Sequence, residues 1–272
     1  MLWFYPILRK TEKYSMKSLN LAKTPSFRLD GRRALVTGAG RGIGLGIATA
    51  FAESGAEVTL CARTADEIEE VATSLRDAGW RADALVLDVT EVSSFRRAID
   101  LAEPFDILAN NAGTNRPKPF IDVPEEDFNA VMDLNVRAAY FAAQAVARRL
   151  IDAGRPGSII NVSSQMGHVG APNRSLYCAS NWAMEGFSRA MAIELGPHGI
   201  RVNTLCPTFV ETPMTRSFLQ DPTFRSSVVN RIKLGRVGTI EDLMGAAVFL
   251  ASDAAALMTG TSLIVDGGWT AD

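Results

Sequence analysis

The chain has 272 residues, is 47% hydrophobic and carries a formal net charge of −2 at pH 7. This length and composition predict one α/β domain with a sizeable core. The small net charge and the lack of a basic run exclude a typical nucleic-acid-binding protein. Three cysteines, Cys61, Cys178 and Cys206, cannot all pair and lack metal-binding spacing, so we expect no metal and a reducing, cytoplasmic compartment.

Residues 1–28 are expected to form an N-terminal extension. Residues 2–8 are apolar but far too few to span a bilayer. Arg9 and Lys10 follow this run, whereas a secretory signal would place its positive charges before it. We therefore expect no membrane partner. Residues 1–15 are interpreted as a flexible arm or an over-extended reading frame before Met16, with a weak membrane-surface anchor as the alternative.

Short apolar runs alternate with helical patterns along the rest of the chain. This alternation, with strands of the fully buried type, predicts a single doubly wound Rossmann-type domain over residues 29–272, with a parallel seven-stranded sheet flanked by helices. The expected strands cover residues 34–36, 58–61, 84–87, 107–109, 158–162, 202–205 and 263–265, and the expected helices include residues 42–54, 66–71, 125–152 and 175–196.

Residues 208–237 are expected to be irregular. Pro213 and Pro222 lie within this stretch, and Pro207 directly precedes it. A connection of this length without regular structure is uncommon in a compact domain unless it is functional. The sequence therefore predicts a substrate lid here.

A glycine-rich turn follows the first expected strand and opens the first helix. It contains Gly38, Gly40, Gly42 and Gly44. Glycines at such a place permit a tight turn and let the backbone approach a pyrophosphate, and the helix N-terminus offers free N–H groups and its positive dipole end. An ordinary tight turn is the alternative, but the strand–turn–helix context favours a dinucleotide site that includes Arg41 and Ile43.

The end of the second expected strand indicates which dinucleotide is bound. An NAD site places an acidic side chain there to bind the ribose 2′-hydroxyl. Ala62 occupies that place, Arg63 follows it, and the next carboxylate is Asp66. Because a guanidinium suits a 2′-phosphate, NADP is favoured over NAD, with Arg41 as a possible second partner. Both arginines could instead be solvated loop residues.

A further pattern lies in the second half of the chain. Ser164 precedes Tyr177 by thirteen residues, and the segment after it reads Tyr177-Cys178-Ala179-Ser180-Asn181. With the glycine-rich turn, these motifs resemble the classical short-chain dehydrogenase/reductase family, whose catalytic signature is a serine followed by Tyr-x-x-x-Lys. The resemblance extends from about Leu29 to the C-terminus. Asn181 occupies the position of the family lysine.

The resemblance implies roles for further residues. The catalytic set would be Asn135, Ser164 and Tyr177, with Asn181 at the lysine position. Cofactor contacts would come from Asp88, Val89, Asn110, Ala112, Gly113, Pro207 and Thr212, together with Tyr177 and Asn181. A structural role is equally open for Asn110. Ser164, Tyr177 and Phe209 are expected to face the substrate. His168 could touch the substrate or act as an auxiliary base, or it could simply be a polar loop residue.

The implied reaction is the interconversion of a secondary alcohol and a ketone on a small, polar substrate. A tyrosine is a weak base at neutral pH, and the family lysine favours its ionised form. Asn181 shares a helix face with Tyr177 but carries no charge, so we expect impaired turnover. Asn181 could be a deliberate substitution, belong to a natural enzyme of weak or altered activity, or mark a catalytically inactive dinucleotide-binding protein.

Assembly is expected to involve the helices at residues 125–152 and 175–196. They carry more small and apolar residues than one sheet face needs, and related proteins pair such helices across a two-fold axis. A homotetramer or homodimer is therefore predicted. The residues that suggested this are Ala138, Ala139, Ala142, Ala143, Ala183, Phe187 and Met191.

Overall fold

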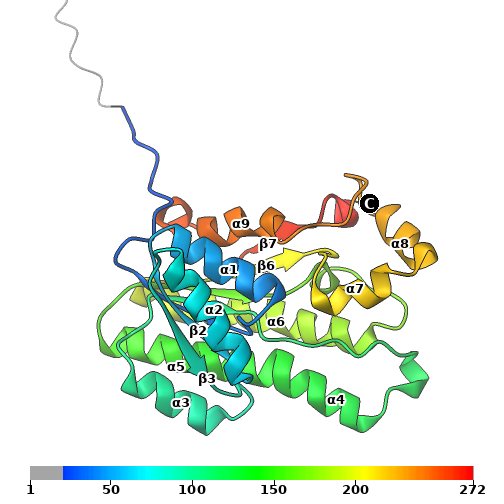
Figure 1. Cartoon of the computed structure of the whole chain (residues 1–272), viewed down its shortest axis with the longest axis horizontal. Helices are drawn as coiled ribbons and strands as arrows, with labels where there is room; N and C mark the ends of the chain where they lie inside the picture. The colour runs from blue at the N-terminus through cyan, green and yellow to red at the C-terminus, as the bar shows by residue number, and fades with distance from the viewer. Residues whose placement is uncertain (1–20, 272) are drawn as a thin grey trace, which may run out of the picture.

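The computed structural model describes residues 21–271, and these form a three-layer α/β structure (Figure 1). Its sheet is parallel, has seven strands and follows the order β3-β2-β1-β4-β5-β6-β7. The predicted doubly wound, seven-stranded fold is therefore confirmed. The strands are β1 (Arg33–Thr37), β2 (Glu57–Ala62), β3 (Ala82–Val86), β4 (Ile107–Asn110), β5 (Gly157–Val162), β6 (Ile200–Pro207) and β7 (Ser262–Val265).

Alternate residues of the central strands feed two separate hydrophobic layers. Val36 of β1 faces the layer formed by α1 (Gly42–Glu53), α2 (Ala65–Asp77) and α9 (Glu241–Ala251). Its neighbour Leu35 faces the layer formed by α3 (Val92–Leu101), α5 (Ala139–Asp152) and α6 (Ser175–Leu195). Figure 1 shows α1 and α9 above the sheet and α3 and α5 below it. Strands buried on both faces explain the continuous apolar runs in the sequence.

The helix expected at residues 125–152 is one continuous rod made of three parts. They are α4 (Glu125–Met132), a π-helical segment (Asp133–Ala138) and α5. The π-helical segment contains Asn135, whose side chain is buried. Wide turns of this kind occur mostly as single bulges at functional sites, because they redirect one side chain without ending the helix.

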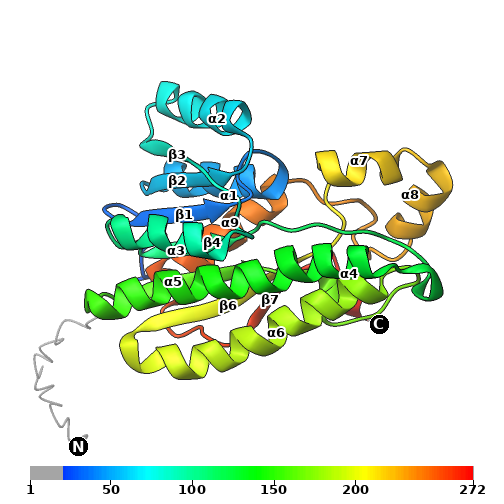
Figure 2. The same cartoon turned by 90° about the horizontal axis from the view of Figure 1, so that it is seen from below.

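The expectation of an irregular lid at residues 208–237 is partly wrong. The stretch contains two short helices, α7 (Pro213–Leu219) and α8 (Pro222–Val229), which lie together at one end of the molecule in Figures 1 and 2. Pro213 and Pro222 each occupy the first helical position, where the missing N–H has no partner to lose. The prolines therefore start helices here, and a small hydrophobic cluster formed by Leu219, Val228, Ile232 and Val237 fixes the segment.

The N-terminal extension lies largely outside the described residues. Expectations about residues 1–15 and Met16 concern a part of the chain that the structure does not describe. Residues 21–28 have no regular secondary structure, and the chain joins the core at Leu29, which is fully buried. No helix within residues 21–271 combines the length and the apolar character that a membrane crossing requires.

Candidate active site

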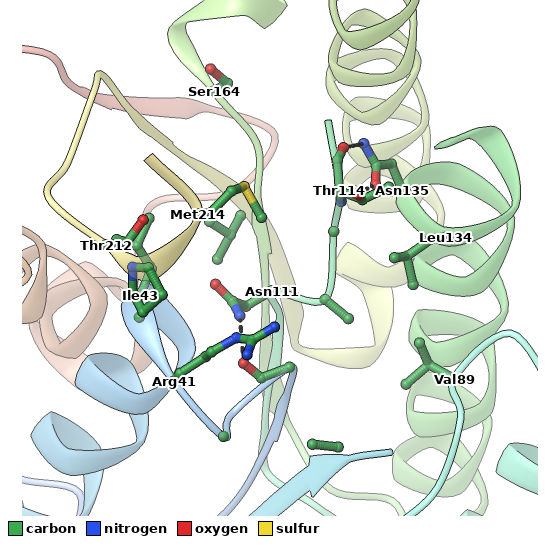
Figure 3. A pocket seen from close by; sticks show the side chains of 18 of the residues that line it. Arg41, Ile43, Val89, Asn111, Thr114, Leu134, Asn135, Ser164, Thr212 and Met214 are labelled. Carbon is green, nitrogen blue, oxygen red and sulfur yellow. Dashed lines mark hydrogen bonds between the residues drawn. The ribbon is translucent and has the colours of Figure 1, made fainter. Parts of the chain in front are cut away.

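A pocket of about 330 Å³ lies at the carboxyl ends of the strands, where connections from distant parts of the sequence meet. Figure 3 shows Ser164 at one end of this pocket and Arg41 toward the other. Most residues expected in the site line it. These are Gly38, Gly40, Arg41, Gly42, Ile43, Arg63, Asp88, Val89, Ala112, Gly113, Asn135, Ser164, Tyr177, Asn181, Pro207 and Thr212.

The glycine-rich turn has the backbone geometry that requires glycine. Gly38 and Gly42 have φ angles of +64° and +61°, a region that side-chain-bearing residues rarely adopt. Gly44 does not line the pocket. A Cβ atom there would overlap the carbonyl oxygen of Gly38 and the side chain of Asn111. Gly44 therefore allows α1 to pack closely against the turn, and this packing fixes the shape of the pocket.

The N-terminus of α1 fits a phosphate group. Arg41 is the N-cap residue, and no side chain caps the first N–H groups of the helix. The first turn also has no acidic residue. Free N–H groups and the positive end of the helix dipole together form an anion-binding position that opens into the pocket.

Two arginines stand at the far end of the pocket, and each is about 72% exposed. Arg63 Nη1 lies 3.5 Å from Asp88 Oδ2, and Arg41 Nη1 lies 3.7 Å from Glu67 Oε1. Both distances exceed a good charge-assisted hydrogen bond, so these exposed ion pairs are weak and leave guanidinium N–H groups for another acceptor. Burial alone would raise the pKa of Asp88, but hydrogen bonds from Thr90 and the charge of Arg63 keep this pKa below its usual value.

At the other end of the pocket, Asn135 holds the loop after β4 against the long helical rod that contains α4 and α5. Its Oδ1 accepts a hydrogen bond from the Thr114 backbone N–H at 2.8 Å, and its Nδ2 donates to the Thr114 carbonyl at 2.9 Å. Figure 3 shows this pair. Nδ2 also lies 3.1 Å from Ser180 Oγ on α6. The π-helical turn thus places one side chain where it ties the loop after β4 to the helix that carries Tyr177.

Asn181 is buried one helical turn beyond Tyr177, as expected. Its Nδ2 donates to the Tyr177 backbone carbonyl at 2.8 Å, and its Oδ1 faces Ser163 Oγ at 3.4 Å. The side chain therefore occupies the place beside the tyrosine with neutral contacts. No positive side chain lines this end of the pocket within the described residues.

The acidity of Tyr177 follows from these surroundings. Burial raises the pKa of its phenol above the ordinary value of 10.0, because a phenolate loses water there. Hydrogen bonds from Ser164 and Asn181 and the positive charge of Arg174 lower this pKa, but the net direction remains upward. Tyr177 is therefore protonated at neutral pH and is ready to donate a proton rather than to accept one.

Three other expected residues lie outside the pocket lining. The buried Asn110 donates to the Ala139 carbonyl at 3.0 Å and to Asn161 Oδ1 at 2.9 Å, so its role is structural. Phe209 packs against Phe224 and Trp269 in the cluster beneath α7 and α8.

The third, His168, turns away from the pocket. A short 3-10 turn (Gln165–Gly167) separates it from Ser164, and its Nε2 lies 3.5 Å from Cys206 Sγ and 3.7 Å from Glu185 Oε1. Glu185 also accepts hydrogen bonds from Thr204 and Ser262. Burial and the Glu185 carboxylate raise the pKa of the Cys206 thiol, so the thiol stays protonated and donates to Glu185. These contacts form a hydrogen-bonded cluster of His168, Glu185 and Cys206 outside the pocket.

Sequence reasoning did not assign other residues that line the pocket. Glu67 follows the start of α2, and Leu134 belongs to the π-helical segment. Met214 comes from α7, so the short helices expected as irregular chain contribute part of the wall. Thr208 also lines the pocket, and its buried hydroxyl has no hydrogen-bond partner within the described residues. Thr208 belongs to the expected Pro207–Thr212 turn, but no local motif marks Glu67, Leu134 or Met214, which only the tertiary arrangement brings to the pocket.

Comparisons with known proteins identify the family. A family model described as enoyl-(acyl carrier protein) reductase matches residues 38–270. D-erythrulose reductase of Gallus gallus is 41% identical over 245 residues, which cover 90% of this chain and 98% of that protein. L-xylulose reductase of Bos taurus is 38% identical over 244 residues, with coverages of 90% and 98%.

A solved structure agrees with this assignment. The gluconate 5-dehydrogenase of Burkholderia cenocepacia, crystallised with NADP and tartrate, matches with a TM-score of 0.88 and 39% identity. The match covers 90% of this chain and 98% of that one. The glycine-rich turn and the Ser164–Tyr177 pair lie within residues 38–270, the region that the family model matches. The chain belongs to the short-chain dehydrogenase/reductase family, a family of NAD(P)-dependent oxidoreductases.

Proposed function

We propose that this protein interconverts a secondary alcohol and a ketone on a small hydroxylated substrate, with NADP(H) as cofactor and with impaired turnover. The observation that carries the proposal is that Ser164 and Tyr177 line the same pocket as the glycine-rich turn and Arg63. The relatives are named for D-erythrulose, L-xylulose and gluconate, which are small and polar. These names support a substrate of that class.

The expected cofactor, NADP, is confirmed by these relatives, one of which was solved with NADP bound. The residues present here fit it. The uncapped N-terminus of α1 would hold the pyrophosphate, and Arg63 with Arg41 would hold the 2′-phosphate. Thr208 lies in the pocket wall, on the turn after β6, and its hydroxyl has no partner among the described residues. This hydroxyl would bind the amide group of the nicotinamide.

When bound, the nicotinamide supplies or accepts the hydride. Side chains of the protein transfer the proton. In reduction, the Tyr177 phenol donates its proton to the developing alkoxide, while the Ser164 hydroxyl holds the same oxygen. In oxidation, Tyr177 must accept a proton, and this requires the phenolate that its surroundings disfavour. The neutral Asn181 therefore impairs oxidation at neutral pH most directly.

A catalytically inactive dinucleotide-binding protein is the second candidate, and Asn181 is the observation that favours it. The two candidates differ in one measurement. Oxidation of NADPH with a panel of small ketoses, at high protein concentration, would support the enzyme. Tight NADP(H) binding without turnover of any ketose or polyol would support the inactive protein.

Assembly into a homodimer or homotetramer also remains a proposal, and the structure changes the residues that would carry it. Ala138, Ala139 and Ala142 are buried in the core of the chain itself, whereas the buried Ala143 also lies at the surface groove of α5 and α6. The outer surface of α5 and α6 instead carries a shallow groove, and these helices lie side by side in Figure 2. Its lining residues are Tyr140, Ala143, Gln144, Ala147, Arg148, Ile151, Met191, Glu194 and Leu195.

The first prediction concerns cofactor choice. Arg63→Ala should weaken NADP(H) binding roughly 10- to 100-fold, because a charge-assisted contact to the 2′-phosphate is lost. Binding of NAD(H) should change little, since it lacks that phosphate. Arg97→Ala, an exposed arginine on α3, serves as the control. Titration calorimetry measures both cofactors, and equal losses for NADP(H) and NAD(H) would show that Arg63 does not read the phosphate.

The second prediction concerns catalysis. A unit charge about 5 Å from the phenolate contributes about 3 kcal/mol at an effective dielectric near 20. Asn181→Lys should therefore raise the oxidation rate at neutral pH by roughly a hundredfold and move the pH optimum downward. Asn181→Gln, which adds length without charge, should do neither. The test is a set of pH–rate profiles on one substrate, and unchanged profiles for Asn181→Lys would mean that another group activates Tyr177.

The third prediction concerns assembly. Light scattering at micromolar concentration should find a dimer or tetramer, and Ile151→Asp in the α5–α6 groove should shift it toward a smaller species. Leu101→Asp, on an exposed position of α3, should leave the mass unchanged. A monomeric parent protein would rule out the assembly.

A further inference from the structure

Arg174 is a partly buried cation with no hydrogen bond to any described residue. It directly precedes α6, and its Nη1 is fully buried without an acceptor. Arg149 and Arg201 also have a buried unpaired nitrogen, but each donates another N–H to a backbone carbonyl. Burial lowers the pKa of Arg174, which is the mark of a charge taken out of water. A buried guanidinium without a partner is costly, so this position calls for an external acceptor.

The location of Arg174 is beside the catalytic end of the pocket. Tyr177, which lines the pocket, follows it by three residues, and the two groups lie close enough for each to affect the other's pKa. The guanidinium carbon lies 5.7 Å from the centre of the Phe218 ring. Phe218 is one helical turn after Met214, another pocket residue, on α7. The Arg174–Phe218 contact therefore borders the pocket between Tyr177 and α7.

Along α6, Arg174 and Asn181 lie on opposite sides of Tyr177. Asn181, at the position that faces the nicotinamide ribose in the family, lies one turn later on α6, whereas Arg174 lies one turn earlier. A substrate whose reacting carbon sits at Tyr177 and Ser164 would extend toward Arg174. The Phe218 ring lies beside the guanidinium and Nη1 is buried, so a substrate would reach Arg174 through its other two nitrogens, Nε and Nη2.

None of the charged residues that line the pocket pairs with Arg174 within the described residues. The charged residues that line it are Arg41, Glu67, Arg63 and Asp88, and they form pairs at the far end. No carboxylate lines the end near Tyr177 within the described residues. Arg116, on the loop after β4, differs from Arg174 because Asp127 already pairs with it at 2.6 Å. Arg174 is thus a positively charged residue beside the catalytic end of the pocket, without an anionic partner among the described residues.

We propose that Arg174 binds the carboxylate of a hydroxy-acid or keto-acid substrate and so selects sugar acids over neutral sugars. A guanidinium can hold a carboxylate through two parallel hydrogen bonds, which also fixes the orientation of the substrate. The inference rests on the proposed function, since it names the substrate class of the same site. The contact with Phe218 would also link an occupied substrate site to the position of α7.

The test compares D-gluconate with D-glucitol, which differ only in a carboxylate against a hydroxymethyl group. Each is titrated into NADP⁺-loaded protein by calorimetry, after NADP⁺ binding has itself been measured. We expect the parent protein to bind D-gluconate at least tenfold more tightly. Arg174→Met should abolish this difference by weakening D-gluconate roughly 10- to 100-fold, and Arg174→Lys should retain part of it. Arg231→Met, which removes an exposed arginine stacked on Trp269, should retain all of it.

Two outcomes would overturn the inference. One is an Arg174→Met variant that keeps the full preference for D-gluconate. If only the pH–rate profile of that variant shifts, Arg174 acts on Tyr177 alone and the inference is also wrong. The other is parent protein that binds NADP⁺ but not D-gluconate. In that second case the cofactor part of the proposed function stands. Loss of NADP⁺ binding by the parent protein would instead contradict the proposed function itself.

Discussion

In the proposed reaction, the cost of forming a phenolate at Tyr177 governs the chemistry of the site. Tyr177 stands in the first turn of α6, where burial raises its pKa. The hydrogen-bonding groups beside it, Ser164 and Asn181, are neutral, and a neutral dipole offsets less of the desolvation cost than a full charge does. The positive charge of Arg174 also lowers the pKa of Tyr177, but not enough to reverse the effect of burial. The protein therefore holds a proton donor in place but disfavours the proton acceptor that oxidation requires.

The fold supplies the rest of the site by bringing the carboxyl ends of parallel strands together. The glycine-rich turn follows β1, Arg63 follows β2, and Ser164 follows β5. The strand order places β1 beside β4, so successive connections leave on opposite faces and open a crevice there. The close packing at Gly44 and the locking of the loop after β4 by Asn135 keep this crevice in shape. In the proposed function, cofactor binding thus depends on features that lie apart from position 181.

Much of this arrangement could be predicted from the sequence because its signals are local. Buried strands read as apolar runs, the glycine-rich turn has its own spacing, and Tyr177 and Asn181 share a helix face by periodicity alone. The signals failed where tertiary context decides the outcome. Pro213 and Pro222 start helices although they resemble loop residues.

Side-chain direction was the other part that the sequence could not determine. His168 lies only four residues after Ser164, yet a 3-10 turn rotates it toward Glu185 and away from the pocket. Ala142 and Ala143 are small residues on a long helix, and this pattern suits a helix–helix interface as well as it suits packing on a sheet. The structure uses them for the sheet. The sequence also could not reveal that Arg174 Nη1 lacks a hydrogen-bond partner, because only the folded chain determines which groups meet.

The most direct test of this account is the pKa of Tyr177 itself. The chain has four tyrosines, so the phenolate absorbance of NADP⁺-bound protein, less that of a Tyr177→Phe variant, isolates the titration of this group. The account predicts a pKa above the ordinary 10.0 in the parent protein. It also predicts a lower pKa in Asn181→Lys, because a nearby cation favours the phenolate. A parent pKa below 10.0, or the same pKa with asparagine and lysine at position 181, would contradict it.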